Sequence, residues 1–448
     1  MDINALTAQF GGFFGVVAAF VVALSVIVAI HEYGHYIVGR WCGIKAEVFS
    51  LGFGPVVWSR FDKHGTQWQL AALPLGGFVK FKGDSSAASG KDGEAMSELS
   101  PAELRQTMHG APLWARSATV VAGPVFNFIL SILVFGAIMM SQGRVSEPLT
   151  VGELKPLPVA GVTLKSGDLI ETIADAPLPE FSDGDAFDAF VDALPREALL
   201  DYGVMRDGAR QTVQGPYPLP PLVTQLSPRS AAYSIDMKSG DVITAVDGTP
   251  ISTFQELKEF VEGSDGRVLM LDVWRDGQML DFALAPRRVD EPQADGGFKT
   301  NWRIGIAGGF AFDPGTDRMG PGAALVGGAV QTLGVVTGSL SGLYHMVTGA
   351  ISSCNMSGPL GIAQVSGAMA SQGVDSFIWF IAVLSTAVGL LNLFPIPVLD
   401  GGHLVFFGYE AVRGKPPSER ALRVMMTVGL TLILGLMVFA LTNDIFCP

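Results

Sequence analysis

An uncharged run from Gly11 to Ile30 limits the folds open to this chain more than any other feature. A helix of about 20 apolar residues is long enough to cross a bilayer. The run ends directly in an HExxH motif, HEYGH at 31–35. On a helix this motif places His31 and His35 one turn apart, where both can bind one zinc ion, with Glu32 placed to take a proton from water. The sequence therefore predicts a zinc hydrolase site at the end of a membrane helix.

The composition favours a membrane protein. The 448 residues have a mean hydropathy of +0.39 and only 16% charged side chains, whereas about a quarter is usual in soluble proteins. The formal net charge of −13 argues against nucleic acid as a partner. Most acidic residues lie between 144 and 318, which predicts a solvated region outside the membrane.

We expect a polytopic α-helical membrane protein with about four transmembrane helices, a membrane-associated β-hairpin and two α+β modules. The predicted helices are 1–40, 112–141, 376–402 and 421–443. A fifth apolar stretch, 323–351, lies within a predicted linker at 291–375 and contains many glycines and scattered polar residues. We interpret it as an amphipathic helix at the interface, because a fifth span would separate the two halves of the site. A spanning role stays open.

Basic residues gather in two connections, 41–111 and 403–420, and are missing from both tails. The positive-inside rule places these connections in the cytoplasm, and both termini and the acidic region outside, which is the periplasm if the protein belongs to the inner membrane of a Gram-negative bacterium. The active site then lies near the cytoplasmic side. The first ten residues lack the basic region of a cleaved signal peptide.

The acidic region contains an internal repeat. LKSGDLI at 164–170 recurs as MKSGDVI at 237–243, and VMRDG at 204–208 recurs as VWRDG at 273–277. Each unit predicts a turn, a strand, a helix and a hairpin. The units, 146–216 and 217–290, resemble tandem PDZ domains. The first lacks a glycine at 173–177 and is followed by an acidic insertion, so the second, near 227–241, is the better candidate for a peptide ligand. A role as a filter for bulky substrates stays open.

A catalytic zinc needs a third protein ligand. The best candidate is Asp400 in NLFPIPVLDGG at 392–402. A carboxylate beside a membrane span is costly unless it is paired or metal-bound. In the predicted topology the first and third spans end at the same face, so Asp400 can approach both histidines. The alternative is that Asp400 caps the following helix.

These motifs, in this order, resemble the site-2 protease family of intramembrane zinc metalloproteases, in particular its bacterial members of the regulator-of-sigma-E type. The resemblance implies Zn²⁺ bound by His31, His35 and Asp400, with Glu32 as the catalytic acid and base. It implies cleavage within single-pass transmembrane segments. The implied substrates are an anti-sigma factor already cut outside the membrane, and remnant signal peptides.

Further residues are candidates for substrate binding. The run Gly76-Gly77-Phe78-Val79 lies in a hairpin predicted over 66–82, turning at about 74–77, and resembles the family's membrane re-entrant β-loop. Such a strand can pair with an unwound substrate, whereas an ordinary cytoplasmic hairpin is the alternative. Asn127, in GPVFN at 123–127, is linked to substrate handling in relatives or serves helix packing. Asn392 donates to substrate or ties down the proline-broken backbone.

Two other functions compete with the protease. A non-catalytic membrane-anchored PDZ scaffold or chaperone would not need Glu32 between two ligands. A metal transporter would need several polar sites along a path, and the sequence has one cluster. The cysteines Cys42, Cys354 and Cys447 form no CxxC pair. We interpret them as packing residues, with a disulfide between Cys354 and Cys447 left open.

Overall fold

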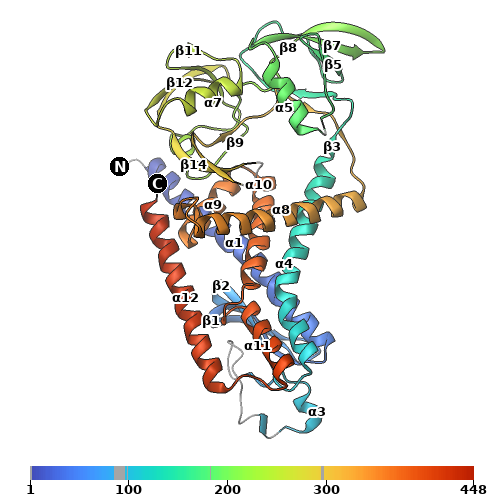
Figure 1. Ribbon diagram of the computed structural model, residues 1–448, viewed down its shortest axis with the longest axis vertical. Helices are drawn as coiled ribbons and strands as arrows, with labels where there is room; N and C mark the ends of the chain where they lie inside the picture. The colour runs from blue at the N-terminus through green and yellow to red at the C-terminus, as the bar shows by residue number, and fades with distance from the viewer. Residues whose placement is uncertain (1–2, 85–95, 98, 182, 294–296, 448) are drawn as a thin grey trace. The chain divides into compact units, whose positions relative to one another are not determined.

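The computed structural model describes residues 3–84, 96–97, 99–181, 183–293 and 297–447. The chain forms two compact units (Figure 1). A mainly helical unit comprises 1–138, 322–347 and 353–448, and a strand-rich unit comprises 139–321 and 348–352.

Among the described residues, five helices are long and apolar enough to cross a membrane. They are α1 (Ile3–Trp41), α4 (Leu113–Gln142), α8 (Pro321–Val347), α10 (Val374–Asn392) and α12 (Glu419–Phe446). Many of their large apolar side chains are exposed, as expected of helices that face lipid rather than a protein core. The fold is that of a polytopic membrane protein.

Helix α8 is the apolar stretch whose placement the sequence leaves open. Its length and composition suit a membrane span, yet Figure 1 shows it crossing α4 at a steep angle. The two backbones meet at Gly136 and Gly328, where an added Cβ would press on the carbonyl oxygens of Ala324 and Ile132. Small residues at this crossing allow the close approach.

Helix α9 (Pro359–Ser371) is fastened to the end of α12. The Asp444 carboxylate accepts hydrogen bonds from the backbone N–H groups of Gly358 and Gly361, both at 2.9 Å, and so caps α9 from another helix. Beside this cap, Cys354 and Cys447 form a disulfide. The expectation that both are packing residues is therefore wrong. Their separation of 93 positions gives no local signal of the bond.

Strands β1 (Ala46–Phe61) and β2 (Gln67–Phe81) both bend, and each contributes two runs to a sheet of four runs. Residues 48–51 pair with 77–80 on one side and with 67–70 on the other, while 67–71 also pair with 56–61. The predicted hairpin over 66–82 is wrong in its pairing, because its two arms flank 46–51 instead of each other. As a result, 77–81 forms one edge of the sheet.

After α10 the chain breaks at the prolines and restarts as α11 (Asp400–Arg413). Gly401 and Gly402 pack on the broken turn, where a Cβ would collide with backbone atoms of Leu393 and Ile396. The glycine pair therefore lets α11 begin directly against the end of α10. The predicted loop at 403–420 is helical over most of its length, a correction to the sequence interpretation. Short helical segments α3 (Pro101–Leu104) and η1 (Ser353–Asn355) also belong to this unit.

The strand-rich unit contains two four-stranded antiparallel sheets of the same order, β6-β5-β7-β8 and β11-β10-β12-β13. The first comprises β5 (Leu169–Ile173), β6 (Ala176–Pro177), β7 (Leu199–Arg206) and β8 (Ala209–Pro216), with helix α5 (Gly184–Ala193). The second comprises β10 (Val242–Val246), β11 (Thr249–Pro250), β12 (Leu269–Arg275) and β13 (Gln278–Leu284), with helices α6 (Ala231–Ser234) and α7 (Phe254–Glu262). Each sheet has its own apolar core.

The repeated motifs meet within each module. Arg206 binds the buried carboxylate of Asp168 through Nε and Nη2 at 2.6 Å, and Arg275 binds Asp241 at 2.6 and 2.7 Å. The Arg206 guanidinium holds the pKa of Asp168 below its usual range. The aspartate of each SGD turn is thus clasped by the arginine of each RDG hairpin, which explains why both motifs recur together.

Short strands close both modules. The hairpin of β14 (Arg287–Pro292) and β15 (Phe298–Arg303) is followed by three strands that return to earlier segments. β16 (Ile306–Ala307) pairs with β9 (Gln225–Leu226), β17 (Phe312–Pro314) with β4 (Val151–Leu154), and β18 (Thr316–Asp317) with β3 (Arg144–Val145). The interpretation of this part of 291–375 as a linker is therefore wrong, because strands of two or three residues carry no periodic signal.

Candidate metal centre

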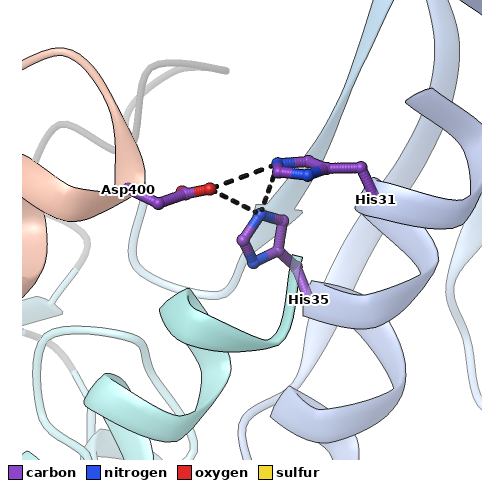
Figure 2. A group of neighbouring side chains, drawn as sticks. All are labelled: His31, His35 and Asp400. Carbon is purple, nitrogen blue, oxygen red and sulfur yellow. Dashed lines mark hydrogen bonds and ion pairs between the residues drawn. The ribbon is translucent and has the colours of Figure 1, made fainter. Parts of the chain in front are cut away.

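Three side chains from two distant parts of the chain converge in the helical unit (Figure 2). His31 and His35 lie one turn apart on α1, and Asp400 is the first residue of α11. The Oδ2 atom of Asp400 lies 3.2 Å from Nε2 of His31 and 3.5 Å from Nε2 of His35, and the two Nε2 atoms are 3.2 Å apart. This is the one such group among the described residues.

The spacing of these atoms fits zinc. Zinc–nitrogen bonds of 2.0–2.1 Å in a tetrahedron place neighbouring ligand atoms about 3.3 Å apart. The three observed separations bracket that value. The side chains are only 11%, 13% and 17% exposed, and buried Oδ2 of Asp400 has no hydrogen-bond donor among the described residues. A carboxylate oxygen held among ligand nitrogens without a donor suits a metal ligand.

Helix α4 shapes the wall behind the histidines. At Gly123 an added Cβ would lie 2.8 Å from Cε1 of His31 and would overlap the His35 ring. Gly34 lies against the carbonyl oxygen of Ala122 in the same way. These two glycines let α1 and α4 approach until both imidazoles fit between them. The signal for Gly123 is present in the GPVFN motif, although the sequence interpretation used only its Asn127.

The Nδ1 atoms of both imidazole rings have partners on α4. Nδ1 of His35 lies 2.8 Å from the backbone carbonyl of Thr119, so it carries the proton and leaves Nε2 free. Pro124 removes the helical hydrogen bond to the neighbouring carbonyl of Val120 and loosens this turn. Nδ1 of His31 lies 3.2 Å from Nδ2 of Asn127. No sequence signal could have indicated the role of Thr119, because every residue has a backbone carbonyl.

Glu32 faces the edge of the sheet. Its carboxyl group lies near the backbone N–H of Val79. At Gly77 a Cβ would come within 3.2 Å of Cγ of Glu32 and 2.9 Å of Val28, so a glycine is needed where this strand passes the helix. The candidate base, the candidate metal ligands and the edge formed by 77–81 therefore lie together.

A cavity of about 930 Å³ opens onto this group. Its lining includes His31, Glu32, His35 and Asp400, and it extends to the start of α12. Of the candidate substrate residues, Gly77, Phe78, Val79 and Asn392 line it. Gly76 packs on the Phe53 ring and Asn127 is fully buried, so neither is on the wall. The Asn392 amide donates to the carbonyl of Val388 at 3.1 Å, which ties it to α10.

An ion pair that the sequence interpretation missed joins α4 to α11. Arg116 binds Glu410 through two hydrogen bonds of 2.6 and 3.1 Å, and its guanidinium also lies over the Phe407 ring. The pair lies on the cavity wall and is mostly buried. It fixes the helix that begins at Asp400. A separation of 294 positions hides it from sequence reasoning.

Comparison with known proteins identifies the family to which this chain belongs. The model of peptidase family M50 matches residues 19–436. The chain belongs to this family, the site-2 proteases. A protein of Agrobacterium fabrum named as a zinc metalloprotease is 36% identical over 448 residues, which cover 99% of both chains. A similarly named protein of Rhizobium meliloti is 34% identical over 96% of both.

Regulator of sigma-E protease RseP of Salmonella typhimurium is 31% identical, over 95% of this chain and 97% of its own. The predicted family is thus confirmed. This M50 chain is a zinc-dependent protease of the kind that performs regulated intramembrane proteolysis, and its His-His-Asp group is consistent with Zn²⁺ as the metal.

Proposed function

We propose that this chain is an endopeptidase that cuts peptide bonds within single-pass transmembrane segments, with His31, His35 and Asp400 holding zinc. The observation that carries the proposal is the tetrahedral spacing of the three ligand atoms beside Glu32. A scaffold or chaperone has no use for a carboxylate placed beside such a centre. The long apolar helix α1, which carries His31 and His35, supports the intramembrane location.

The residues divide the chemistry among themselves. When bound, zinc supplies Lewis acidity that activates water near neutral pH and polarises a peptide carbonyl. Glu32 takes the proton from the attacking water and returns it to the leaving nitrogen. The second amide N–H of Asn392, on the cavity wall, donates to the substrate carbonyl as negative charge develops there.

Metal removal tests this function. Treating the purified protein with a zinc chelator should abolish cleavage of a model transmembrane substrate in detergent, and one equivalent of Zn²⁺ should restore it, because the described residues contain one group suited to a metal and its ion would supply the chemistry. A serine-protease inhibitor is the matched control and should have no effect. Cleavage that survives complete removal of zinc would contradict the proposal, and no cleavage at any zinc concentration would favour the scaffold.

Substrate binding is proposed at the free edge of 77–81. A transmembrane helix hides its amides in internal hydrogen bonds and must unwind before attack. An unwound segment can then pair with an unsatisfied strand edge. The edge beside Gly77 and Val79 lies next to Glu32, so a paired substrate would run past the metal ligands.

Crosslinking tests this placement, and the sheet provides its own control. With Cys42 replaced by serine and Glu32 by glutamine, Phe78→Cys should form a disulfide with a substrate that carries one cysteine near the scissile bond. Val57→Cys lies on the opposite edge, 69% exposed, and should not. Equal crosslinking from both positions would argue against pairing at 77–81.

We also propose a membrane location and topology. The protein lies in a bacterial inner membrane with four spans, α8 at the interface, and both termini and both modules in the periplasm. The disulfide near the C-terminus supports an oxidising side for that end. In intact cells, a membrane-impermeant thiol reagent should label Glu153→Cys but not Lys415→Cys. The reverse pattern would overturn the orientation.

The proposed substrates are anti-sigma-factor-like proteins already trimmed outside, and remnant signal peptides. The relative named regulator of sigma-E protease supports the first. The two modules, which we interpret as PDZ-like, act as a size filter, and the second is the candidate to bind a peptide. A substrate with a bulky outer domain should be cut only after trimming. Equal cleavage of untrimmed and trimmed substrate would exclude the filter.

A further inference from the structure

The environment of His31 contains one polar side chain that the proposed chemistry does not use. Asn127 is 0% exposed. Its Nδ2 lies 3.2 Å from Nδ1 of His31, and its Oδ1 is buried without a hydrogen-bond partner among the described residues. Asn127 does not line the cavity, so its amide faces the back of the imidazole rather than a substrate. A buried amide oxygen without a donor is costly unless it gains one in another state of the site.

The backbone of Asn127 is held firmly. Oγ of Ser385 donates to its carbonyl oxygen at 3.0 Å, and the single O–H of Ser131 is shared between that oxygen, at 3.0 Å, and the carbonyl of Ala382 on α10, at 2.8 Å. These contacts fix α4 against α10 at the level of the metal centre. The amide is therefore presented to His31 from a rigid support, as a ligand-orienting group requires.

Zinc binding sets the protonation of the ring. Nε2 of His31 faces Asp400 and His35, so it must offer its lone pair to the metal, and the single proton of the neutral imidazole is then on Nδ1. With that proton in place, an N–H of Asn127 opposite Nδ1 would set two donors against each other. A rotation of the amide by half a turn exchanges Nδ2 and Oδ1 and presents an acceptor instead.

We propose that Oδ1 of Asn127 accepts the hydrogen bond from Nδ1–H of His31 and thereby holds the ring in the zinc-binding tautomer. Asn127 is then a positioning residue, the counterpart of the Thr119 carbonyl at His35. An asparagine can also donate to an unprotonated Nδ1, so one residue serves the ring with and without metal. This inference rests on the proposed zinc site. It replaces substrate binding as the role of Asn127.

Zinc affinity of the full-length protein in detergent tests the role. Competition with a fluorescent chelator should give Asn127→Leu an affinity about 10–100-fold weaker than wild type, the usual effect of losing such a partner. Asn127→Asp supplies only acceptors and should bind zinc at least as tightly as wild type. Ser385→Ala is the matched control, because it removes a contact to the Asn127 backbone and leaves the amide. It should stay within about threefold of wild type.

Three results would overturn the inference. The zinc affinity of Asn127→Leu could lie within about threefold of wild type, or the affinity of either Asn127→Asp or Ser385→Ala could be as weak as that of Asn127→Leu. Melting of the zinc-free variants checks their fold. If Asn127→Leu does not fold, Asn127→Ala carries the same expectation. If the proposed zinc site itself is wrong, the result is different, because His31→Ala would then bind zinc as tightly as wild type.

Discussion

Replacing Glu32 with glutamine should slow cleavage of a transmembrane substrate by about 10²–10⁴-fold, the range expected for loss of a general base. The amide keeps the size of the carboxylate and an acceptor oxygen, but it takes up no proton. Because Glu32 is not among the three ligand side chains, the purified variant should retain its zinc. Single-turnover cleavage in detergent and metal analysis on the same sample measure both quantities.

Glu47→Gln is a matched control for this experiment. Glu47 lies on β1, where it pairs with Lys80, and its side chain is 41% exposed. An exposed pair contributes little to stability, so activity should stay near wild type. A Glu32→Gln protein that cleaves at a similar rate to this control would remove Glu32 from the mechanism. A variant that lost its zinc would instead mean that Glu32 supports the metal.

Asp400→Ala should weaken zinc binding by more than about 100-fold, beyond the loss expected for an outer partner. The change leaves two protein ligands where catalytic zinc sites use three. Activity should fall with metal content, and excess Zn²⁺ should restore only part of it. Asp400→Asn keeps an oxygen at the same place without the charge and should lie between alanine and wild type. Metal analysis after dialysis compares the zinc content of wild type, Asp400→Asn and Asp400→Ala.

The same variant separates the metal role from a helix cap. The N-cap of α11 is Leu399, which forms no side-chain cap bond, and Asp400 is already the first helical residue. A capping role predicts a less stable α11 with zinc affinity unchanged. A protein that carries Asp400→Ala, binds zinc like wild type and melts at a lower temperature would therefore favour the cap.

The sequence was sufficient for the features that depend on strong local patterns. The uncharged run and HEYGH located a spanning helix and two of the three converging side chains, because both features are contiguous. Asp400 was found through the cost of a carboxylate next to a membrane span. The repeated SGD and RDG segments predicted two similar modules, and the structure shows two sheets of the same order.

The features that sequence reasoning missed depend on distant pairing. Residues 77–81 form a sheet edge only because 46–51 lie between the two arms of β2. The Arg116–Glu410 pair and the disulfide join positions 294 and 93 residues apart. The carbonyl of Thr119 acts through its backbone, which every residue shares. Such contacts appear only when packing has brought the segments together.

The return of β17 and β18 to β4 and β3 has a consequence for how this chain was assembled. The N–H of Ala311 bonds to the carbonyl of Pro218 at 2.9 Å, so the chain leaves and re-enters the first module at neighbouring points. The residues between Pro218 and Ala311 therefore form an insertion within the first module. Deleting 219–309 and joining the ends with a few glycines should leave the first module folded. The second module can therefore be removed by genetic deletion.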